Sequence, residues 1–125
     1  MENKSKKVLV LVEDDEVLAR VLDTVLTGAG YIVKIDYSGA TSEETIRREK
    51  PDCVLLDILL PVKNGFEILE GLMKDETTRN IPVIILSNLG QDSEVKKGME
   101  LGAKNYIVKS NVDVYDIPKI VAKYI

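Results

Sequence analysis

Short apolar runs alternate along this chain with longer segments in which apolar residues recur at helical spacing. The apolar runs, which we interpret as buried strands, lie at Val8–Val12, Tyr31–Asp36, Cys53–Leu56, Pro82–Leu86 and Asn105–Val108. Strands buried on both faces have such continuous runs, and parallel strands need a crossover helix between them. The pattern predicts an α/β fold: one (βα)5 unit with a five-stranded parallel sheet, doubly wound by helices.

The first and third helices are the most strongly patterned. In the first helix, apolar residues repeat every four positions and form one stripe of six: Val17, Leu18, Val21, Leu22, Val25 and Leu26. We expect this helix to end at Gly28 or Gly30, because glycine commonly closes a helix. The third helix follows the turn dipeptide Asn64-Gly65 and has a comparable stripe beginning at Phe66.

The remaining helices have less apolar surface. The second, over residues 42–49, is expected to be short and largely solvated, and the fourth has only Val95 and Met99 at helical spacing. We therefore expect the fourth helix to be weakly anchored to the sheet. The last helix contains Pro118, which a helix tolerates only in its first turn, so Asp116 rather than Asp113 is the expected N-cap.

Composition narrows the setting. The chain has 125 residues, 45% of them hydrophobic, which suits one domain over residues 1–125 with a polar extension at residues 1–6. A net charge of −4 argues against direct binding to nucleic acid or to an anionic membrane. No apolar stretch reaches the roughly 20 residues that span a bilayer, and the N-terminus lacks a secretory apolar region. We expect a cytoplasmic protein.

Two residue types set further limits on the chemistry. Cys53 is the only cysteine and lies in an apolar run, which favours an inert core thiol. Histidine is absent, which excludes histidine triads, histidine-ligated zinc and any phosphohistidine within this chain.

Polar residues follow the apolar runs at four strand ends. Glu13 and Asp14 end the first run and Asp57 the third, while Ser87 and Lys109 end the fourth and fifth. The carboxyl ends of parallel strands lie at one edge of a doubly wound sheet, so these groups are expected to converge there.

The expected acidic cluster favours a divalent cation. Neighbouring carboxylates repel one another unless a cation or a proton intervenes. Oxygen ligands with room for water suit Mg²⁺, for which Mn²⁺ can substitute. Beside the carboxylates, the Ser87 hydroxyl can donate to a phosphoryl oxygen, and Lys109 can neutralise phosphate charge. These residues indicate a metal-assisted acceptor of a phosphoryl group.

The chain resembles the receiver domain of response regulators in two-component signalling, and the resemblance covers nearly all of it. The matching motifs are Leu11-Val12-Glu13-Asp14-Asp15, Leu56-Asp57-Ile58-Leu59-Leu60-Pro61 with Gly65, Ile85-Leu86-Ser87, and Gly102-Ala103-Lys104-Asn105-Tyr106-Ile107-Val108-Lys109. The resemblance implies the flavodoxin-like strand order 2-1-3-4-5. It also implies that Asp57 accepts a phosphoryl group from a phosphohistidine on another protein.

The resemblance assigns the other residues as well. Asp14 is implied as a direct Mg²⁺ ligand, Glu13 as a ligand acting partly through water, and the backbone carbonyl of Leu59 as a further ligand beside Asp57. Asp15 lies just outside the acidic pair, and we expect it to cap the first helix.

Three further side chains are implied in sensing the phosphoryl group. Ser87 and Tyr106 form the implied switch pair, in which phosphate draws the hydroxyl inward and the ring follows. Lys109 is implied to contact the phosphoryl group. By its own propensity, Tyr106 could equally be an ordinary half-buried strand aromatic.

The implied partners are proteins. The donor is a histidine kinase or a histidine phosphotransfer protein, and a downstream effector binds the face formed by the fourth helix, fifth strand and fifth helix. The protein is then no enzyme beyond its own phosphorylation and dephosphorylation. It is a monomer or a phosphorylation-dependent dimer, and either a single-domain regulator or a segment of a longer chain.

The chain departs from the family pattern at several positions. Ser110 follows Lys109 where receivers usually have proline, so this peptide is expected to be strained and cis, or trans with a changed direction of the lysine. Asn88 replaces a small residue, which either narrows access to the site or adds a hydrogen bond. Leu59 and Leu89 are apolar where relatives have polar side chains that help to position water, which predicts slow autodephosphorylation.

Three other functions compete with a phosphorylated receiver. A flavodoxin-like cofactor binder needs a glycine-rich phosphate loop after the first strand, and the acidic run there would repel phosphate. An aspartyl-phosphate phosphatase resembles a pattern with a second acid two residues beyond the nucleophile, where this chain has Leu59. A degenerate receiver that binds proteins independently of phosphorylation remains the main alternative.

Overall fold

A computed structural model describes residues 6–125; apart from Lys6, the expected polar extension lies outside the described residues. The strands are β1 (Val8–Val12), β2 (Ile32–Asp36), β3 (Cys53–Leu56), β4 (Val83–Ser87) and β5 (Asn105–Val108). The helices are α1 (Glu16–Gly28), α2 (Ser42–Glu49), α3 (Gly65–Lys74), α4 (Asp92–Glu100) and α5 (Ile117–Ala122).

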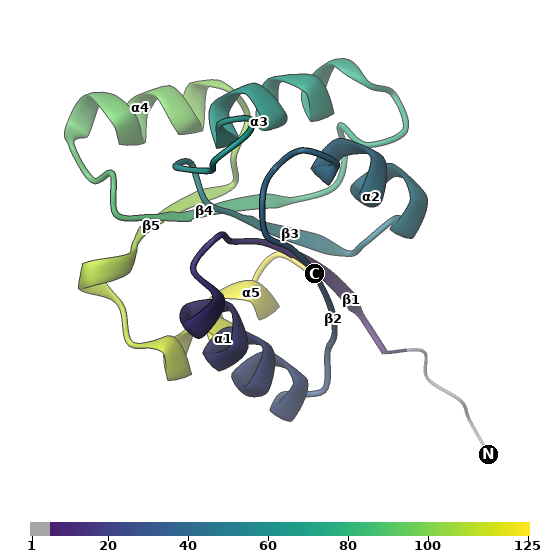
Figure 1. The fold of residues 1–125 in the computed structure, drawn as a ribbon, viewed down its shortest axis with the longest axis vertical. Helices are drawn as coiled ribbons and strands as arrows, with labels where there is room; N and C mark the ends of the chain where they lie inside the picture. The colour runs from purple at the N-terminus through teal and green to yellow at the C-terminus, as the bar shows by residue number, and fades with distance from the viewer. Residues whose placement is uncertain (1–5) are drawn as a thin grey trace.

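The strands form one parallel sheet in the order β2-β1-β3-β4-β5. The predicted (βα)5 fold and strand order are confirmed. Three strands have the predicted bounds, whereas β2 begins one residue later and β4 is shifted by one residue to end with Ser87 itself. Figure 1 shows α2, α3 and α4 on one face of the sheet and α1 and α5 on the other.

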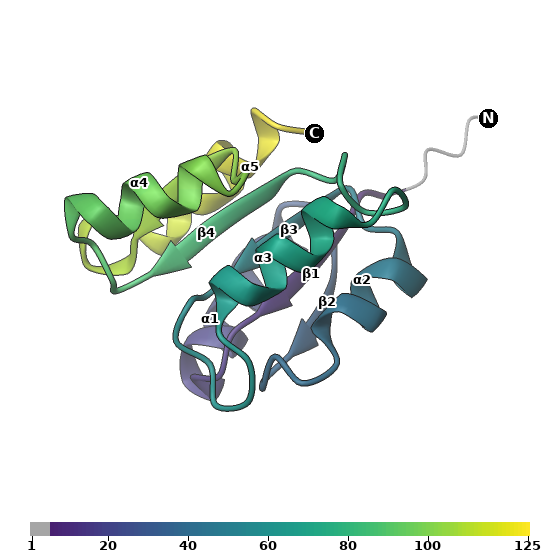
Figure 2. The same ribbon diagram turned by 90° about the horizontal axis from the view of Figure 1, so that it is seen from above.

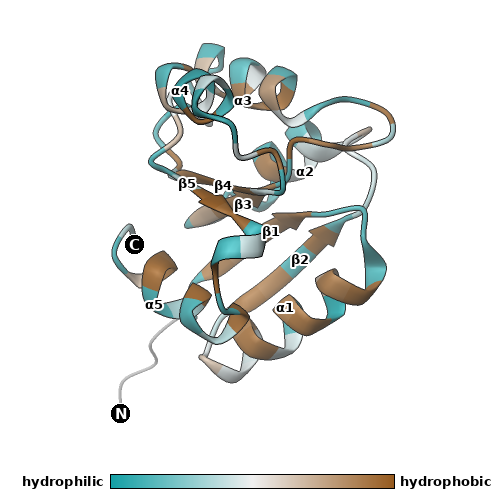
Figure 3. Cartoon of the chain, turned by 90° about the vertical axis from the view of Figure 1, so that its left-hand side faces the viewer, coloured by the Kyte–Doolittle hydropathy of each residue, from teal (hydrophilic) through white to brown (hydrophobic). Residues whose placement is uncertain are grey.

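Each face of the sheet has its own hydrophobic core. The core under α2, α3 and α4 includes Val54, Ile68 and Leu69, all fully buried. The opposite core, under α1 and α5, includes Leu22 and Leu55. Figure 2 shows α2, α3 and α4 lying over the sheet, and Figure 3 shows the strands predominantly in hydrophobic colours between the helices. Burial on both faces explains the continuous apolar runs of β1, β3 and β4.

Helix α1 begins and ends as predicted. The Asp15 carboxylate accepts hydrogen bonds from the backbone N–H groups of Val17 and Leu18 at 3.0 and 3.1 Å, which makes Asp15 its N-cap. The helix ends at Gly28, and Gly30 has a positive φ of 102° at the turn into β2.

The dipeptide Asn64-Gly65 forms the start of α3. Asn64 is the N-cap: its side chain accepts from the Glu67 N–H at 3.1 Å, and Glu67 accepts from the Asn64 N–H at 3.3 Å. Gly65 is then the first helical residue, and its N–H donates to the Ile58 carbonyl at 2.9 Å. This capping box fixes the end of the loop that follows Asp57.

Helix α4 approaches the sheet through a glycine. Met99 is 43% exposed and Val95 is only partly buried, which agrees with the small apolar surface expected of this helix. Gly98 is the buried residue of this helix. A Cβ at Gly98 would lie 2.6 Å from Ile85 and 2.9 Å from the Tyr106 ring, so glycine permits the close approach.

The two remaining helices match their predictions. Helix α2 is short, with Ser42 and Ile46 as its buried residues. Asp116 precedes α5 as the N-cap, and Pro118 lies in the first turn of that helix. Asp113 caps a separate 3-10 turn, Val114–Asp116, by accepting from the Tyr115 N–H. Among the described residues, none of the helices is sufficiently long and apolar to cross a bilayer.

Cys53 is fully buried in β3, and burial raises the pKa of its thiol to about 12. The thiol therefore stays protonated and out of reach of reagents in the folded protein, as predicted. We expect a thiol-specific reagent such as Ellman's reagent to react with Cys53 only as fast as the protein unfolds. When the urea concentration is increased, the rate of the thiol reaction will rise in proportion to the unfolded fraction of the protein. Stoichiometric reaction in the native protein within seconds would contradict this burial.

Candidate functional site

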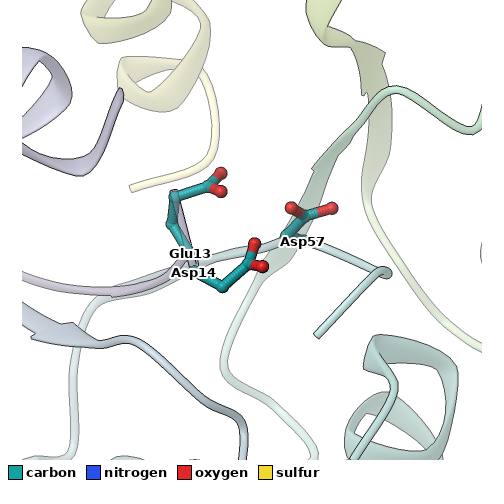
Figure 4. Close-up of side chains that lie close together, drawn as sticks. All are labelled: Glu13, Asp14 and Asp57. Carbon is teal, nitrogen blue, oxygen red and sulfur yellow. The ribbon is translucent and has the colours of Figure 1, made fainter. Parts of the chain in front are cut away.

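Three carboxylates converge at the carboxyl edge of the sheet. Glu13 and Asp14 follow β1 and Asp57 follows β3, and one ligand oxygen from each lies within 4.8 Å of the others (Figure 4). They line a hollow of about 250 Å³ together with Asp15, Leu59, Asn88 and Lys109. The register of β1 on β3, in which Val12 is paired with Leu56, explains why their acidic successors meet.

Glu13 has both carboxylate oxygens engaged although its side chain is almost fully buried. Oε1 lies 2.7 Å from the Lys109 ammonium, and Oε2 accepts from the Asp15 N–H at 3.1 Å. Burial raises the pKa of Glu13, the nearby Asp57 carboxylate adds to this, and the bonds to Lys109 and Asp15 oppose it. Each oxygen of Glu13 thus already has one partner, which leaves less of its acceptor capacity for a cation than that of the exposed Asp14 carboxylate.

Asp57 is fixed from two sides at the floor of the hollow, with only 4% of its surface exposed. Its Oδ1 accepts from the backbone N–H groups of Ile58 at 2.7 Å and Leu59 at 3.3 Å. Its Oδ2 lies 2.8 Å from the Lys109 ammonium. The carboxylate is therefore held in one orientation by the start of its own loop and by a cation from β5.

Lys109 reaches the acidic cluster despite Ser110. The Lys109–Ser110 peptide is trans, and Lys109 begins a 3-10 turn, Lys109–Asn111, directly after β5. Its ammonium bonds to both Glu13 and Asp57, so the expected change in the direction of the lysine is wrong. Burial lowers the pKa of Lys109, but hydrogen bonds to the two carboxylates outweigh burial and raise it overall. Lys109 stays charged at neutral pH.

Ser87 and Tyr106 both contact the backbone of Leu89. The buried Ser87 hydroxyl accepts from the Leu89 N–H at 3.3 Å, and the Tyr106 hydroxyl donates to the Leu89 carbonyl. Tyr106 is partly buried; burial raises its pKa, and the charges of Glu94 and Asp57 add to the effect. The Leu89 peptide therefore connects Ser87 to Tyr106.

The donor set fits a divalent cation. Three carboxylates face one ammonium group, which leaves an excess of negative charge in a hollow open to water. The Asp14 carboxylate is exposed and free to bind directly, whereas both oxygens of Glu13 are already engaged. All-oxygen ligands with space for water are those that Mg²⁺ prefers.

Several groups in the site were not identified from the sequence. The N–H groups of Ile58 and Asp15 orient the two buried carboxylates, and the Leu89 peptide connects Ser87 to Tyr106. Backbone donors and acceptors in loops have no residue-type signature, so no pattern could indicate them. Asn88 lines the hollow and is exposed, a position compatible with either interpretation given above.

Known proteins that resemble this chain are response regulators. The AfsQ1 transcriptional regulatory protein of Streptomyces coelicolor is 35% identical over 101 residues, which are 81% of this chain and 44% of that protein. The response regulator PleD of Caulobacter vibrioides is 36% identical over 106 residues, 85% of this chain and 23% of that protein. The chain spans less than half the length of these curated relatives.

A solved structure has the same fold. The receiver domain of Klebsiella pneumoniae RstA, crystallised in a BeF3-activated form, superposes with a TM-score of 0.81 at 31% identity and covers 92% of this chain and 96% of that one. The manganese-bound response regulator Rcp1 superposes with a TM-score of 0.83 at 26% identity and covers 94% and 93% of the two chains. The family description "Response regulator receiver domain" matches residues 9–122. The chain therefore belongs to the response regulator receiver domain family.

Proposed function

We propose that Asp57 accepts a phosphoryl group from a phosphohistidine on another protein. The observation that carries this proposal is the Asp57 carboxylate, held by two backbone N–H groups and Lys109 at the floor of an acidic hollow. A carboxylate oxygen forms the new bond to phosphorus as the bond to the donor's imidazole nitrogen breaks. The electron pair of that bond stays on the nitrogen.

The residues around Asp57 would prepare it for this transfer. Lys109, 2.8 Å from Oδ2, would neutralise charge on the transferred group, because positioning and fixed charge are the main contributions of a protein to phosphoryl transfer. The Ile58 and Leu59 N–H groups would keep the carboxylate aimed at the hollow. The Ser87 hydroxyl would give up its hydrogen bond from the Leu89 N–H and donate its own proton in a hydrogen bond to a phosphoryl oxygen. The Tyr106 side chain would then change position, because its hydroxyl is bonded to the carbonyl of Leu89.

The metal ligands would be Asp14, Asp57, the Leu59 carbonyl and Glu13 through water. Bound there, Mg²⁺ would offset the carboxylate charges and neutralise charge that develops on the phosphoryl oxygens. Mn²⁺ also suits oxygen ligands, and the similar response regulator Rcp1 has been solved in a manganese-bound form.

The proposed partners are proteins of a phosphorelay. The 125 residues contain no histidine, so the phosphohistidine lies outside them, and the proposed donor is a histidine kinase or a histidine phosphotransfer protein. The proposed effector surface is the face of α4, β5 and α5, because most residues of α4 are exposed and only Gly98 of this helix is buried. The chemistry of the protein would be limited to phosphorylation and dephosphorylation of Asp57. The proposed location is the cytoplasm, and the proposed partners do not include nucleic acid.

Incubation with Mg²⁺ and acetyl phosphate tests this proposal. We expect the intact protein to gain the mass of one phosphoryl group, in an adduct that alkali removes, and to gain none when EDTA is present. Asp57→Asn will abolish the adduct, while Asp23→Asn, the same change on α1, will leave it intact. No adduct on the unaltered protein would favour the degenerate receiver, which binds partners independently of phosphorylation.

Leu59 and Leu89 are the basis of a prediction about the lifetime of the adduct. Leu59 is 56% exposed at the rim of the hollow, so a polar side chain there would reach water beside the phosphoryl group. We expect Leu59→Asn to speed autodephosphorylation about fivefold, since one hydrogen bond that positions water contributes about 1 kcal/mol. The decay of the adduct after removal of the phosphodonor measures this rate, with Val62→Asn as a control on the same loop. An unchanged decay in Leu59→Asn would count against the role of this position.

A further inference from the structure

An ion pair joins the loop that carries Leu59 to a neighbouring helix. Glu43 in the first turn of α2 binds the ammonium of Lys63, which lies between β3 and α3. The side chains of Glu43 and Lys63 are 23% and 39% exposed, so the pair is partly shielded from water. Neither residue has a role in the proposed phosphoryl transfer.

Gly71 of α3 makes room for the Glu43 side chain. A Cβ at position 71 would lie 2.7 Å from the carboxyl carbon of Glu43, which is shorter than any normal carbon–carbon contact. The carboxylate therefore rests directly on the backbone of α3, and there it reaches Lys63. The position of the Glu43 carboxylate is therefore determined by α2, by the backbone of α3 and by the loop between β3 and α3.

The backbone before α2 supports the same loop. The Val62 N–H donates to the Ser38 carbonyl at 3.3 Å. Gly39 has a positive φ of 83°, and a Cβ there would lie 2.7 Å from the Lys63 carbonyl oxygen. The segment between β2 and α2 is thus in close contact with the loop at Val62 and Lys63.

The other end of the loop belongs to the acidic site. The Leu59 N–H donates to Asp57 at 3.3 Å, and Leu59 lines the hollow. Between Leu59 and Lys63 the chain has only three residues. The Leu59 peptide and the ion-paired Lys63 are therefore close together along the chain.

We propose that Glu43 is a positioning residue for the acidic site, because its ion pair with Lys63 holds the loop so that Leu59 faces the cation and the phosphoryl group. The inference rests on the proposed function, since it assumes that the Leu59 carbonyl binds Mg²⁺. Glu43 itself touches neither the metal ligands nor Asp57. It acts through the loop.

Two matched variants test this role. Glu43→Gln removes the ion pair, and Glu44→Gln makes the same change at the next position, which is exposed and in the same first turn of α2. We expect calorimetry to show that Glu43→Gln binds Mg²⁺ about two- to fivefold more weakly, because a loss of this size corresponds to one partly screened ion pair. The Mg²⁺ affinity of Glu44→Gln will be unchanged. Hydrogen exchange of the Val62 amide will be faster in Glu43→Gln only. The charge-swapped double variant, Glu43→Lys with Lys63→Glu, will recover part of the Mg²⁺ affinity and part of the protection of the Val62 amide from exchange.

The two readouts separate this inference from the proposed function. Equal Mg²⁺ affinity in the two single variants, with the unaltered protein binding Mg²⁺, would overturn the positioning role alone. If the unaltered protein bound no Mg²⁺, the proposed function would fail and the metal part of this inference with it. Equal Val62 exchange in the two variants would overturn the claim that the ion pair holds the loop.

Discussion

Lys109→Met will destabilise the protein by about 2 kcal/mol in the absence of metal and slow phosphorylation of Asp57 by about 100-fold. The Lys109 ammonium is the partner of two buried carboxylates, Glu13 and Asp57, which are 1% and 5% exposed. Methionine keeps an apolar stem, which lines a small cavity together with Leu18 and Leu22, but removes the charge. The two carboxylates are then left to repel each other with reduced access to water.

The destabilisation of Lys109→Met is expected to depend on metal. Mg²⁺ can bind the carboxylates that Lys109 no longer engages, so it will raise the stability of the variant more than that of the unaltered protein. Urea unfolding with and without Mg²⁺ measures the stability of the variant and the gain in stability from the metal. The control is Lys104→Met, which changes an exposed lysine before β5. A variant as stable as the control in both conditions would contradict the ion-pair geometry.

Gly65→Ala will destabilise the protein by about 3 kcal/mol, near the upper end of the range for overpacking. A Cβ at Gly65 would lie 2.8 Å from the Ile58 Cα and 3.0 Å from the Asp57 carbonyl carbon. Both are backbone atoms, so a side-chain rotation cannot relieve the clash. The loop after Asp57 must shift, and the bond from the Gly65 N–H to the Ile58 carbonyl will lengthen or break.

Gly28→Ala is the matched control for Gly65→Ala. Gly28 is the last residue of α1, and a Cβ there would meet nothing within 4 Å. Because alanine is a better helix former than glycine, this change should be neutral or stabilising by up to about 1 kcal/mol. Thermal or urea unfolding compares the two variants directly. Equal stability would show that the close approach of α3 to Asp57 is not as tight as described.

The sheet could be predicted because burial on two faces leaves a simple pattern. The continuous apolar runs gave β1, β3 and β5 their bounds, and the topology of parallel strands gathered Glu13, Asp14, Asp57 and Lys109 at one edge. That convergence needs no local motif, since it depends only on which residue follows each strand. The strand order came from the family resemblance, because periodicity carries no information on which strands are neighbours.

Helix α4 could not be predicted in the same way. Its sequence has only Val95 and Met99 at helical spacing, which predicted weak anchoring, and the buried residue is Gly98, which lets the helix backbone approach Ile85 and Tyr106. A pattern of apolar residues detects packing by side chains and cannot detect close packing that depends on a missing side chain. The register of this helix on the sheet therefore needed the structure.

The direction of Lys109 was also beyond the sequence. Without the usual proline, the sequence left two alternatives, a strained cis peptide or a trans peptide that changes the direction of the lysine. The peptide is trans, yet with the 3-10 turn Lys109–Asn111 it leaves the ammonium 2.8 Å from Asp57. A turn after a strand is set by several backbone angles at once, and one residue type does not determine them. The same limit applies to the Ile58 and Asp15 N–H groups, which orient the buried carboxylates.

Reduction of the phosphorylated protein by borohydride tests the role of Asp57 most directly. Borohydride converts an acyl phosphate to an alcohol, so an aspartate that carried the phosphoryl group becomes homoserine. After incubation with Mg²⁺ and acetyl phosphate, we predict homoserine in place of Asp57 in the peptide that contains it, and unchanged aspartate at Asp14 and Asp15. An intact Asp57 after reduction, or homoserine at another aspartate, would contradict the assignment of Asp57 as the phosphoacceptor.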